Sequence, residues 1–183
     1  MINDIKTCHK CNLCANQSPL LDNVKNANIM VVGLSAKIKH NSTEIPLDRR
    51  TRSGSLVSEL EEIAQNYGYN FYRTNLIKCV PLDVNGKLRY PTEEEIDLCF
   101  KNLVIEMDYI KPQIVILFGG IVVDAFANQL RLCFSKSSIQ TYRFQKMDGR
   151  YYIPMYHPSY VLRSKARKDI YINNFVRLIQ DLL

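Results

Sequence analysis

The 183-residue sequence has no apolar run close to the roughly 20 residues of a membrane-spanning helix. Its first residues, Met1 to Asp4, also lack the basic and apolar regions of a secretion signal. We therefore expect a cytoplasmic protein that does not bind membranes. The patterns G-x-x-x-x-G-K-[ST], G-x-G-x-x-G and G-x-S-x-G are absent too. Their absence argues against phosphate-loop enzymes and Ser-His-Asp hydrolases.

Acidic residues are scarce in the last third of the chain. Residues 131–183 contain ten Lys or Arg and only three Asp or Glu, whereas the preceding residues are nearly balanced in charge. A basic surface on one side of a protein suits a polyanion such as nucleic acid, so DNA is a candidate partner. The alternative is a solvated basic face without a partner.

Length and composition predict a single globular domain over residues 1–183, which we expect to be monomeric. Apolar runs predict strands, and apolar residues at helical spacing predict helices between them. The expected strands are 28–33, 71–79, 112–119 and 151–156. The expected helices begin at Ser53 or Ser55, at the Thr92–Glu95 capping box, at 120 and at 168.

This alternation predicts an α/β fold, a three-layer sandwich with a central, largely parallel four-stranded sheet and helices on both faces. Active sites of such sheets lie at the carboxyl ends of the strands. The segments expected at that edge are 34–53, 79–91, 119–120 and 157–163. Residues 1–26 form a cysteine-rich lead-in to the first strand.

The cysteines need an explanation other than disulfide bonds, since a chain of this size buries enough surface to fold without them. Three of them, Cys8, Cys11 and Cys14, are each separated from the next by two residues, and Cys79 and Cys99 follow much later. Zinc, an iron–sulfur cluster and plain burial are all compatible with this spacing, although an iron–sulfur cluster better tolerates scattered ligands. We expect Cys133, in an apolar stretch, to belong to the core.

Four segments, taken in order, resemble the iron–sulfur uracil-DNA glycosylases known as family four. They are Cys8-x2-Cys11-x-Leu13, Val31-Val32-Gly33, Thr74-Asn75-Leu76-Ile77-Lys78-Cys79-Val80-Pro81 with the acidic run before Cys99, and Pro112 to Gly119 followed by His157-Pro158-Ser159-Tyr160. The resemblance covers nearly the whole chain. It implies a [4Fe–4S] cluster on Cys8, Cys11, Cys79 and Cys99, with Cys14 as an extra thiol or a substitute ligand.

The resemblance also implies roles for two polar residues. Asn75 matches the asparagine that reads the Watson–Crick edge of a flipped base, for which an amide offers one donor and one acceptor. His157 matches the histidine that stabilises negative charge on the leaving base. The structural alternatives are a turn-closing asparagine and an ordinary structural histidine. The residues implied in DNA contact are Arg49, Arg50, Arg52, Ser159, Tyr160, Arg163, Lys165 and Arg167.

The first motif departs from the family pattern. Leu34 stands where the family has an acid after glycine, and Leu47 stands where it has an aromatic ring that stacks on the base. His40 and Asn41 occupy the places of later acids, so we expect either to position the attacking water. Gly33, Leu34, Ser35 and Leu47 are expected to line the base pocket, and Tyr72 or another tyrosine could supply a substitute stacking surface.

Three functional hypotheses follow. The first is a DNA glycosylase that flips uracil, or a related modified base, and hydrolyses its N-glycosidic bond. The second is a protein of the same fold that binds DNA or a base without efficient cleavage, which the altered first motif favours. The third is a redox protein using the cluster; the lack of a fourth nearby cysteine argues against it.

Overall fold

The strands of the computed structural model form one sheet with the order β2-β1-β3-β5-β4. The structure describes residues 2–23, 26–41, 43–135 and 138–182. Four of the strands run parallel, and each is largely apolar and buried, as a sheet covered on both faces requires. They are β1 (Ile29–Ser35), β2 (Phe71–Ile77), β3 (Ile114–Phe118) and β5 (Arg150–Met155). The predicted α/β class is thus confirmed.

The predicted number of strands is wrong, because the sheet has five. The additional strand, β4 (Gln145–Met147), pairs antiparallel with β5 through a hairpin whose tip is Asp148-Gly149. Both tip residues have positive φ, 50° and 78°, which favours Asp-Gly in a tight hairpin turn. The strand was missed because it is a short, polar edge strand without an alternating apolar pattern.

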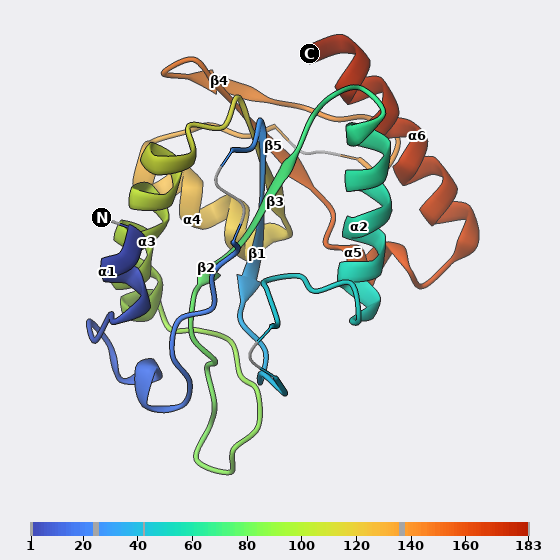
Figure 1. The fold of residues 1–183 in the computed structure, drawn as a ribbon. Coiled ribbons are helices and arrows are strands. Elements are labelled where there is room, and N and C mark those ends of the chain that lie inside the picture. Colours follow the sequence, from blue (N-terminus) through green and yellow to red (C-terminus); the bar gives the residue numbers. More distant parts are fainter. Residues whose placement is uncertain (1, 24–25, 42, 136–137, 183) are drawn as a thin grey trace.

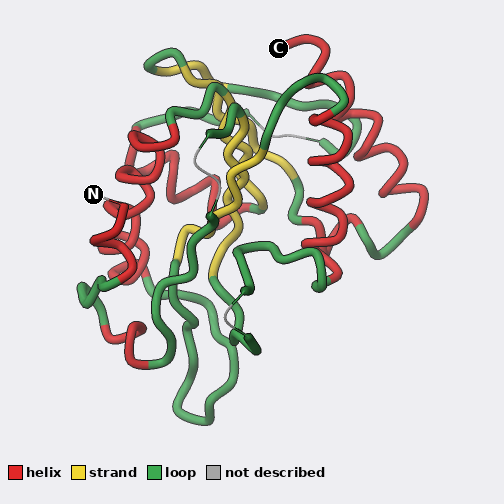
Figure 2. Tube along the Cα trace, in the orientation of Figure 1, coloured by secondary structure: helices red, strands yellow, loops and turns green. Residues whose placement is uncertain are grey.

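Helices cover both faces of the sheet (Figures 1 and 2). On one face, α3 (Glu93–Ile110) and α4 (Gly120–Leu130) enclose a core with the side chains of Tyr72, Leu117 and Tyr152. The lead-in helix α1 (Ile2–Lys6) packs on α3, and a 3-10 turn (Asn12–Ala15) follows it.

The opposite face is covered by α2 (Arg52–Gln65) and α6 (Lys165–Leu182), with the short α5 (Pro158–Val161) beside them. The capping box of α3 is confirmed, since Thr92 Oγ1 accepts from the Glu95 N–H and the Glu95 carboxylate accepts from the Thr92 N–H. The predicted starts of α2 and α6 were late. The N-cap of α2 is Thr51, whose hydroxyl accepts from the Gly54 N–H at 3.0 Å, so the helix begins at Arg52.

Helices long and apolar enough to cross a bilayer were sought among the described residues, and none was found.

Candidate active site and cysteine cluster

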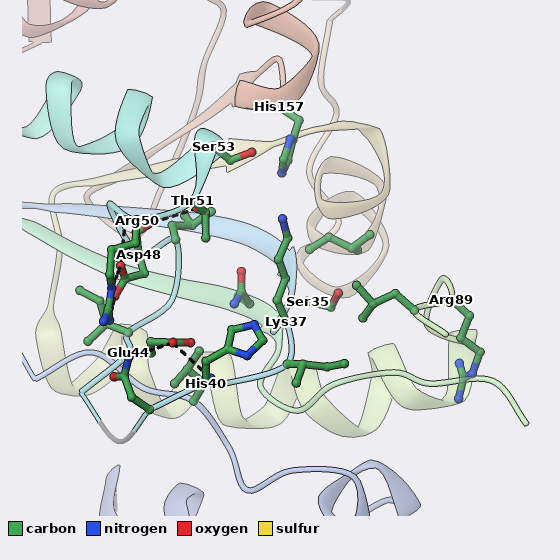
Figure 3. A pocket seen from close by; sticks show the side chains of 18 residues that line it. Ser35, Lys37, His40, Glu44, Asp48, Arg50, Thr51, Ser53, Arg89 and His157 are labelled. Carbon is green, nitrogen blue, oxygen red and sulfur yellow. Dashed lines mark hydrogen bonds and ion pairs between the residues drawn. The ribbon is translucent and has the colours of Figure 1, made fainter. Parts of the chain in front are cut away.

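A pocket of about 810 Å³ opens at the carboxyl ends of the parallel strands (Figure 3). Its walls come from the end of β1, from β2, from His157 shortly after β5 and from the long segment that joins β1 to α2, with further residues from the lead-in and from the loop between β2 and α3. Parallel strands direct their carboxyl ends to one edge, so residues far apart in sequence meet there. The lining residues that the sequence had singled out are Leu34, Ser35, His40, Asn41, Leu47, Arg50, Asn75 and His157.

Asn75 lies on β2 with only 3% of its surface exposed, opposite Gly33 on β1. Its carboxamide makes no hydrogen bond to the part of the chain that the structure describes. Because Asn75 lines the pocket, this carboxamide is ready to pair with a ligand that offers one donor and one acceptor. A Cβ at position 33 would lie 2.4 Å from Asn75 Oδ1, so only glycine leaves room for the amide.

Leu47 packs beside this amide. Its Cδ2 lies 3.3 Å from the place of a Cβ on Gly33, and its own φ is +52°, a conformation that branched residues rarely adopt. The Arg73 guanidinium holds this turn by donating to the Leu47 carbonyl at 2.9 Å. Leu47 thus offers an apolar surface in the pocket. Tyr72 does not, because it is fully buried on the α3 side with its hydroxyl on Glu106, which overturns the expectation that it stacks on a base.

His157 caps the N-terminus of α5. Its Nδ1 accepts the Ser159 N–H at 3.1 Å and lies 2.8 Å from Ser159 Oγ. A backbone N–H can only donate, so Nδ1 is unprotonated and the neutral ring carries its proton on Nε2. Burial, and secondarily the charge of Lys37, lower the pKa of His157. The ring is therefore neutral near pH 7, with one N–H donor left for the pocket into which it points (Figure 3).

Lys37 extends toward His157 across the pocket (Figure 3). Replacing Lys37 with methionine is expected to raise the pKa of His157, because a nearby positive charge disfavours the imidazolium. The pKa can be measured by following the His157 ring protons by NMR during a pH titration. Lys101→Met, an exposed lysine on α3, is the matched control and should leave the titration unchanged. A fall in the pKa after Lys37→Met would contradict this interpretation.

The same shift has a consequence for stability. The folded state binds its proton on His157 less tightly than the unfolded chain does, so the unfolded state holds more protons between the two pKa values. The contribution of His157 to the free energy of unfolding is therefore fully present at pH values above the ordinary pKa of histidine. It declines as the pH falls through the lower pKa that His157 has in the folded state.

The segment that contains His40 and Asn41 folds back on Glu44 (Figure 3). Glu44 Oε1 accepts from the His40 N–H and from the Asn41 carboxamide, each at 3.2 Å. The Asn41 oxygen accepts from Thr43. The Asn41 amide is thus engaged within its own turn, whereas the Glu44 carboxylate lines the pocket. The position-by-position reading of the first motif did not select Glu44, because its contacts with His40 and Asn41 depend on how this segment folds.

Asp48 is a second carboxylate in the pocket that the sequence did not single out. Arg50 Nε and Nη2 bond its two oxygens at 2.8 and 2.7 Å, and this pairing holds the pKa of Asp48 well below its usual range. Arg49 pairs with Glu62, and Arg52 donates to the Leu162 carbonyl. These three arginines, predicted to contact DNA, are therefore all engaged within the protein.

The residues predicted after His157 form an exposed aromatic and basic surface. Tyr160 stacks on Tyr156 with ring centroids 5.1 Å apart, and Arg163 and Arg167 lie over its ring at 5.6 and 4.9 Å. Ser159 is bound to His157 instead, which makes it a support for that ring. Lys165 begins α6 and is exposed. Stacked rings with flanking cations are a combination suited to bases and phosphates.

Five cysteines surround one small cavity between the lead-in, the end of β2 and α3. They are Cys8, Cys11, Cys14, Cys79 and Cys99. Burial, with the added repulsion of neighbouring thiols, raises the pKa of Cys79 to about 12, and burial also raises the pKa of Cys99 and Cys11. The four thiols named from the sequence therefore do converge, although they come from segments up to 91 positions apart, the separation of Cys8 and Cys99.

Cys14 differs from the other four because its thiol donates to the Cys11 carbonyl at 3.2 Å and lies 3.3 Å from His9 Nδ1. Among the described residues, no three His, Cys, Asp or Glu side chains are placed to hold a single metal ion. A multi-iron cluster needs its ligands spaced around a larger group than one ion. Cys133 is exposed, which overturns the expectation that it belongs to the core: it follows the end of α4, where the chain leaves the sheet.

An α/β domain with an amide and a histidine near the carboxyl edge of its parallel strands is the arrangement expected from the resemblance to uracil-DNA glycosylases. The family model described as the uracil DNA glycosylase superfamily matches residues 21–183. The chain therefore belongs to the uracil DNA glycosylase superfamily.

Within that superfamily, the chain is similar to the type-4 branch. It is 25% identical over 166 residues to the type-4 uracil-DNA glycosylase of Thermotoga maritima, covering 90% of this chain and 82% of that protein. It is 24% identical over 184 residues to the type-4 uracil-DNA glycosylase of Archaeoglobus fulgidus, covering 97% of this chain and 89% of that protein.

Proposed function

We propose that this protein is a DNA glycosylase that binds a flipped uracil, or a related modified base, and hydrolyses its N-glycosidic bond. The observation that carries the proposal is the buried Asn75 amide without a partner among the described residues, in a pocket shared with the free N–H of His157. The amide N–H2 complements uracil O4, and the amide oxygen complements uracil N3–H. Family membership and the type-4 relatives support the same reaction.

Cleavage of the bond leaves negative charge on the base and positive charge on the sugar. The neutral His157 donates from Nε2 to the base oxygen on which negative charge develops, a stabilisation that grows toward the transition state. Leu47 covers the base with an apolar surface in place of an aromatic ring. Tyr160, with Arg163 and Arg167, contacts the DNA strand beside the flipped nucleotide.

Leu34 cannot stabilise positive charge on the sugar, and we assign that role to Glu44. Its carboxylate is fixed by two donors and lines the same pocket, so it can balance the sugar charge and orient the attacking water. His40 then acts mainly through its backbone N–H, and Asn41 through its amide, as supports of that carboxylate.

Replacing Glu44 with glutamine is expected to lower the single-turnover rate of uracil release about 10²-fold, the lower end of typical general acid–base contributions. The variant keeps the size of the side chain and removes its charge. Glu94→Gln, an exposed carboxylate in the first turn of α3, is the matched control and should retain the full rate. Equal rates for Glu44→Gln and the control would remove Glu44 from the mechanism.

We also propose that Cys8, Cys11, Cys79 and Cys99 hold a [4Fe–4S] cluster, as the type-4 resemblance implies. The donor set fits, because these four thiols line one cavity, and the fifth thiol there, that of Cys14, donates to the Cys11 carbonyl. Bound there, the cluster supplies a structural cross-link between the lead-in, the end of β2 and α3. The sulfur atoms of Cys8 and Cys99 already accept hydrogen bonds from the Asn102 amide and the Lys78 N–H.

Replacing Cys79 with serine is expected to abolish stoichiometric iron binding and to lower the melting temperature by roughly 10 °C. A lost cross-link typically costs about 2–5 kcal/mol, and each kcal/mol shifts the melting temperature by about 2–4 °C in a chain of this size. Iron analysis and thermal unfolding measure the two effects. Cys133→Ser, at an exposed position, is the control. Cys14→Ser should keep its iron, because Cys14 lies outside the proposed ligand set.

The direct test is strand scission by alkali after incubation with labelled DNA that bears one uracil, single-stranded and duplex. Matched DNA with thymine at the same position is the control. Cleavage of the uracil strand alone supports the proposal. Intact DNA at enzyme excess, with binding to that DNA retained, would overturn uracil excision and favour the alternative of a binding protein, which the Leu34 substitution motivates.

A further inference from the structure

A buried charged pair lies beneath Asn75. Lys78 and Glu106 are both 0% exposed, and they form an ion pair between the end of β2 and the middle of α3. Two charges removed from water are expensive, and removal of either partner would leave the other unpaired. Neither side chain lines the base pocket, so the reaction proposed above leaves this pair without a role.

The ammonium of Lys78 has three hydrogens, and each has an acceptor. It pairs with Glu106 Oε2, donates to Thr74 Oγ1 at 2.7 Å and donates to the Asn75 backbone carbonyl at 2.6 Å. Glu106 also accepts from the Tyr72 hydroxyl at 2.7 Å and from Thr74 Oγ1 at 3.0 Å. Every group of this network is therefore saturated, which fixes the ammonium in one position.

The contact with the Asn75 carbonyl matters because β2 is an edge strand. Its only neighbour in the described sheet is β1, so one row of its backbone groups has no strand partner. Side chains take that place: Lys78 holds the Asn75 carbonyl, and Asp22 accepts the Arg73 N–H at 2.8 Å. The orientation of the Asn75 peptide sets the direction of its Cα–Cβ bond, and thereby the aim of its carboxamide.

The other end of Lys78 is anchored at the cysteine cavity. Its backbone N–H donates to Cys99 Sγ at 3.4 Å, the residue lines that cavity, and the next residue is Cys79. One residue thus connects the cysteine cluster to the backbone of the asparagine in the pocket.

We propose that Lys78 is a positioning residue for base recognition, which aims the Asn75 carboxamide by holding its backbone carbonyl against the buried carboxylate of Glu106. This role rests on the proposed function, in which Asn75 reads the base. Lys78 itself touches neither the base nor the DNA.

The test is a double-mutant cycle between this pair and Asn75. Lys78→Met alone would leave the buried charge of Glu106 unpaired. The variant is therefore Lys78→Met/Glu106→Gln, which is neutral at both positions and keeps an acceptor for Tyr72 and Thr74. It is expected to lower kcat/KM for uracil DNA about 10–10²-fold, since misplacement by about 1 Å has such effects. In an Asn75→Ala background the same change should cost less than about twofold.

Lys101→Met on the exposed side of α3 is the matched control and should keep the full kcat/KM. Iron content and the affinity for DNA without uracil should be unchanged in the double variant, which separates aiming of the amide from loss of fold. Equal losses in the two backgrounds would overturn the proposal, since Lys78 would then act independently of Asn75. Loss of iron together with activity would overturn it too, as the effect would pass through the cluster.

A crystal structure of Lys78→Met/Glu106→Gln gives a readout that needs no activity. The Asn75 carbonyl is expected to move and its carboxamide to turn, while the rest of the pocket stays in place. An unchanged Asn75 would overturn the positioning role even if uracil is released normally. If the wild type releases no uracil, the proposed function fails, and the crystal structure still decides whether Lys78 aims Asn75.

Discussion

Replacement of His157 by alanine is expected to lower the single-turnover rate of uracil release by about 10²–10³-fold, the usual effect of removing one donor from an anion-stabilising site. The effect is large because the Nε2–H acts in a partly buried pocket and is aimed before the reaction begins. Its aim comes from Nδ1, which accepts from Ser159 at 3.1 Å and cannot carry the proton. The rate is measured at enzyme excess, where product release does not interfere.

Two further variants define what the His157 result means. Ser159→Ala removes the hydroxyl at 2.8 Å from Nδ1 and leaves the backbone donor, so its rate should fall much less than that of His157→Ala. His157→Gln keeps an N–H donor and should recover part of the loss. A rate for His157→Ala within about twofold of wild type would show that anion stabilisation lies elsewhere.

Replacement of Asn75 by alanine is expected to lower kcat/KM for uracil DNA by about 10–10²-fold, since a bidentate contact with a base edge is worth about 1–3 kcal/mol. Affinity for DNA without uracil should stay the same, because backbone contacts carry most of that affinity. Fluorescence anisotropy measures this binding, and uracil release measures the specific loss.

Asn75→Asp tests the role of the Asn75 amide more strictly than Asn75→Ala does. Its carboxylate retains an acceptor for N3–H but loses the donor for O4 and places negative charge against it, so its loss should at least equal that of alanine. Retention of uracil release by Asn75→Asp would contradict the assignment of Asn75 as the reader of the base edge.

Much of the fold was predictable from local pattern. The apolar runs ending at Gly33 and Gly119 gave the strands β1 and β3, and Thr92 with Glu95 gave the start of α3. These signals are local, because a buried parallel strand must be apolar throughout and a helix must satisfy its first N–H groups. The hairpin of β4 carries no apolar alternation, and only the Asp148-Gly149 turn hinted at it.

The pocket was predictable in part. Asn75 and His157 could be named because the resemblance to the family-four glycosylases implies a role for each, and the carboxyl ends of parallel strands were expected to meet at one edge. Glu44 could not, because its place depends on how the segment after β1 folds back. The contacts of Arg49 and Arg52 within the protein could not be predicted either, since they depend on the Glu62 carboxylate of α2 and the Leu162 carbonyl at the end of α5.

The α/β class, the edge of the sheet that carries the pocket and the resemblance to the glycosylase family can all be inferred from the amino-acid sequence. Those features follow from periodicity and from short motifs, in which cause and effect lie within a few residues. The folded structure was needed to show that five thiols share one cavity, that the Asn75 amide has no hydrogen-bond partner among the described residues, and that Lys78 and Glu106 form an ion pair beneath it. Such facts depend on contacts between segments far apart in the chain, which form when the helices close over the sheet.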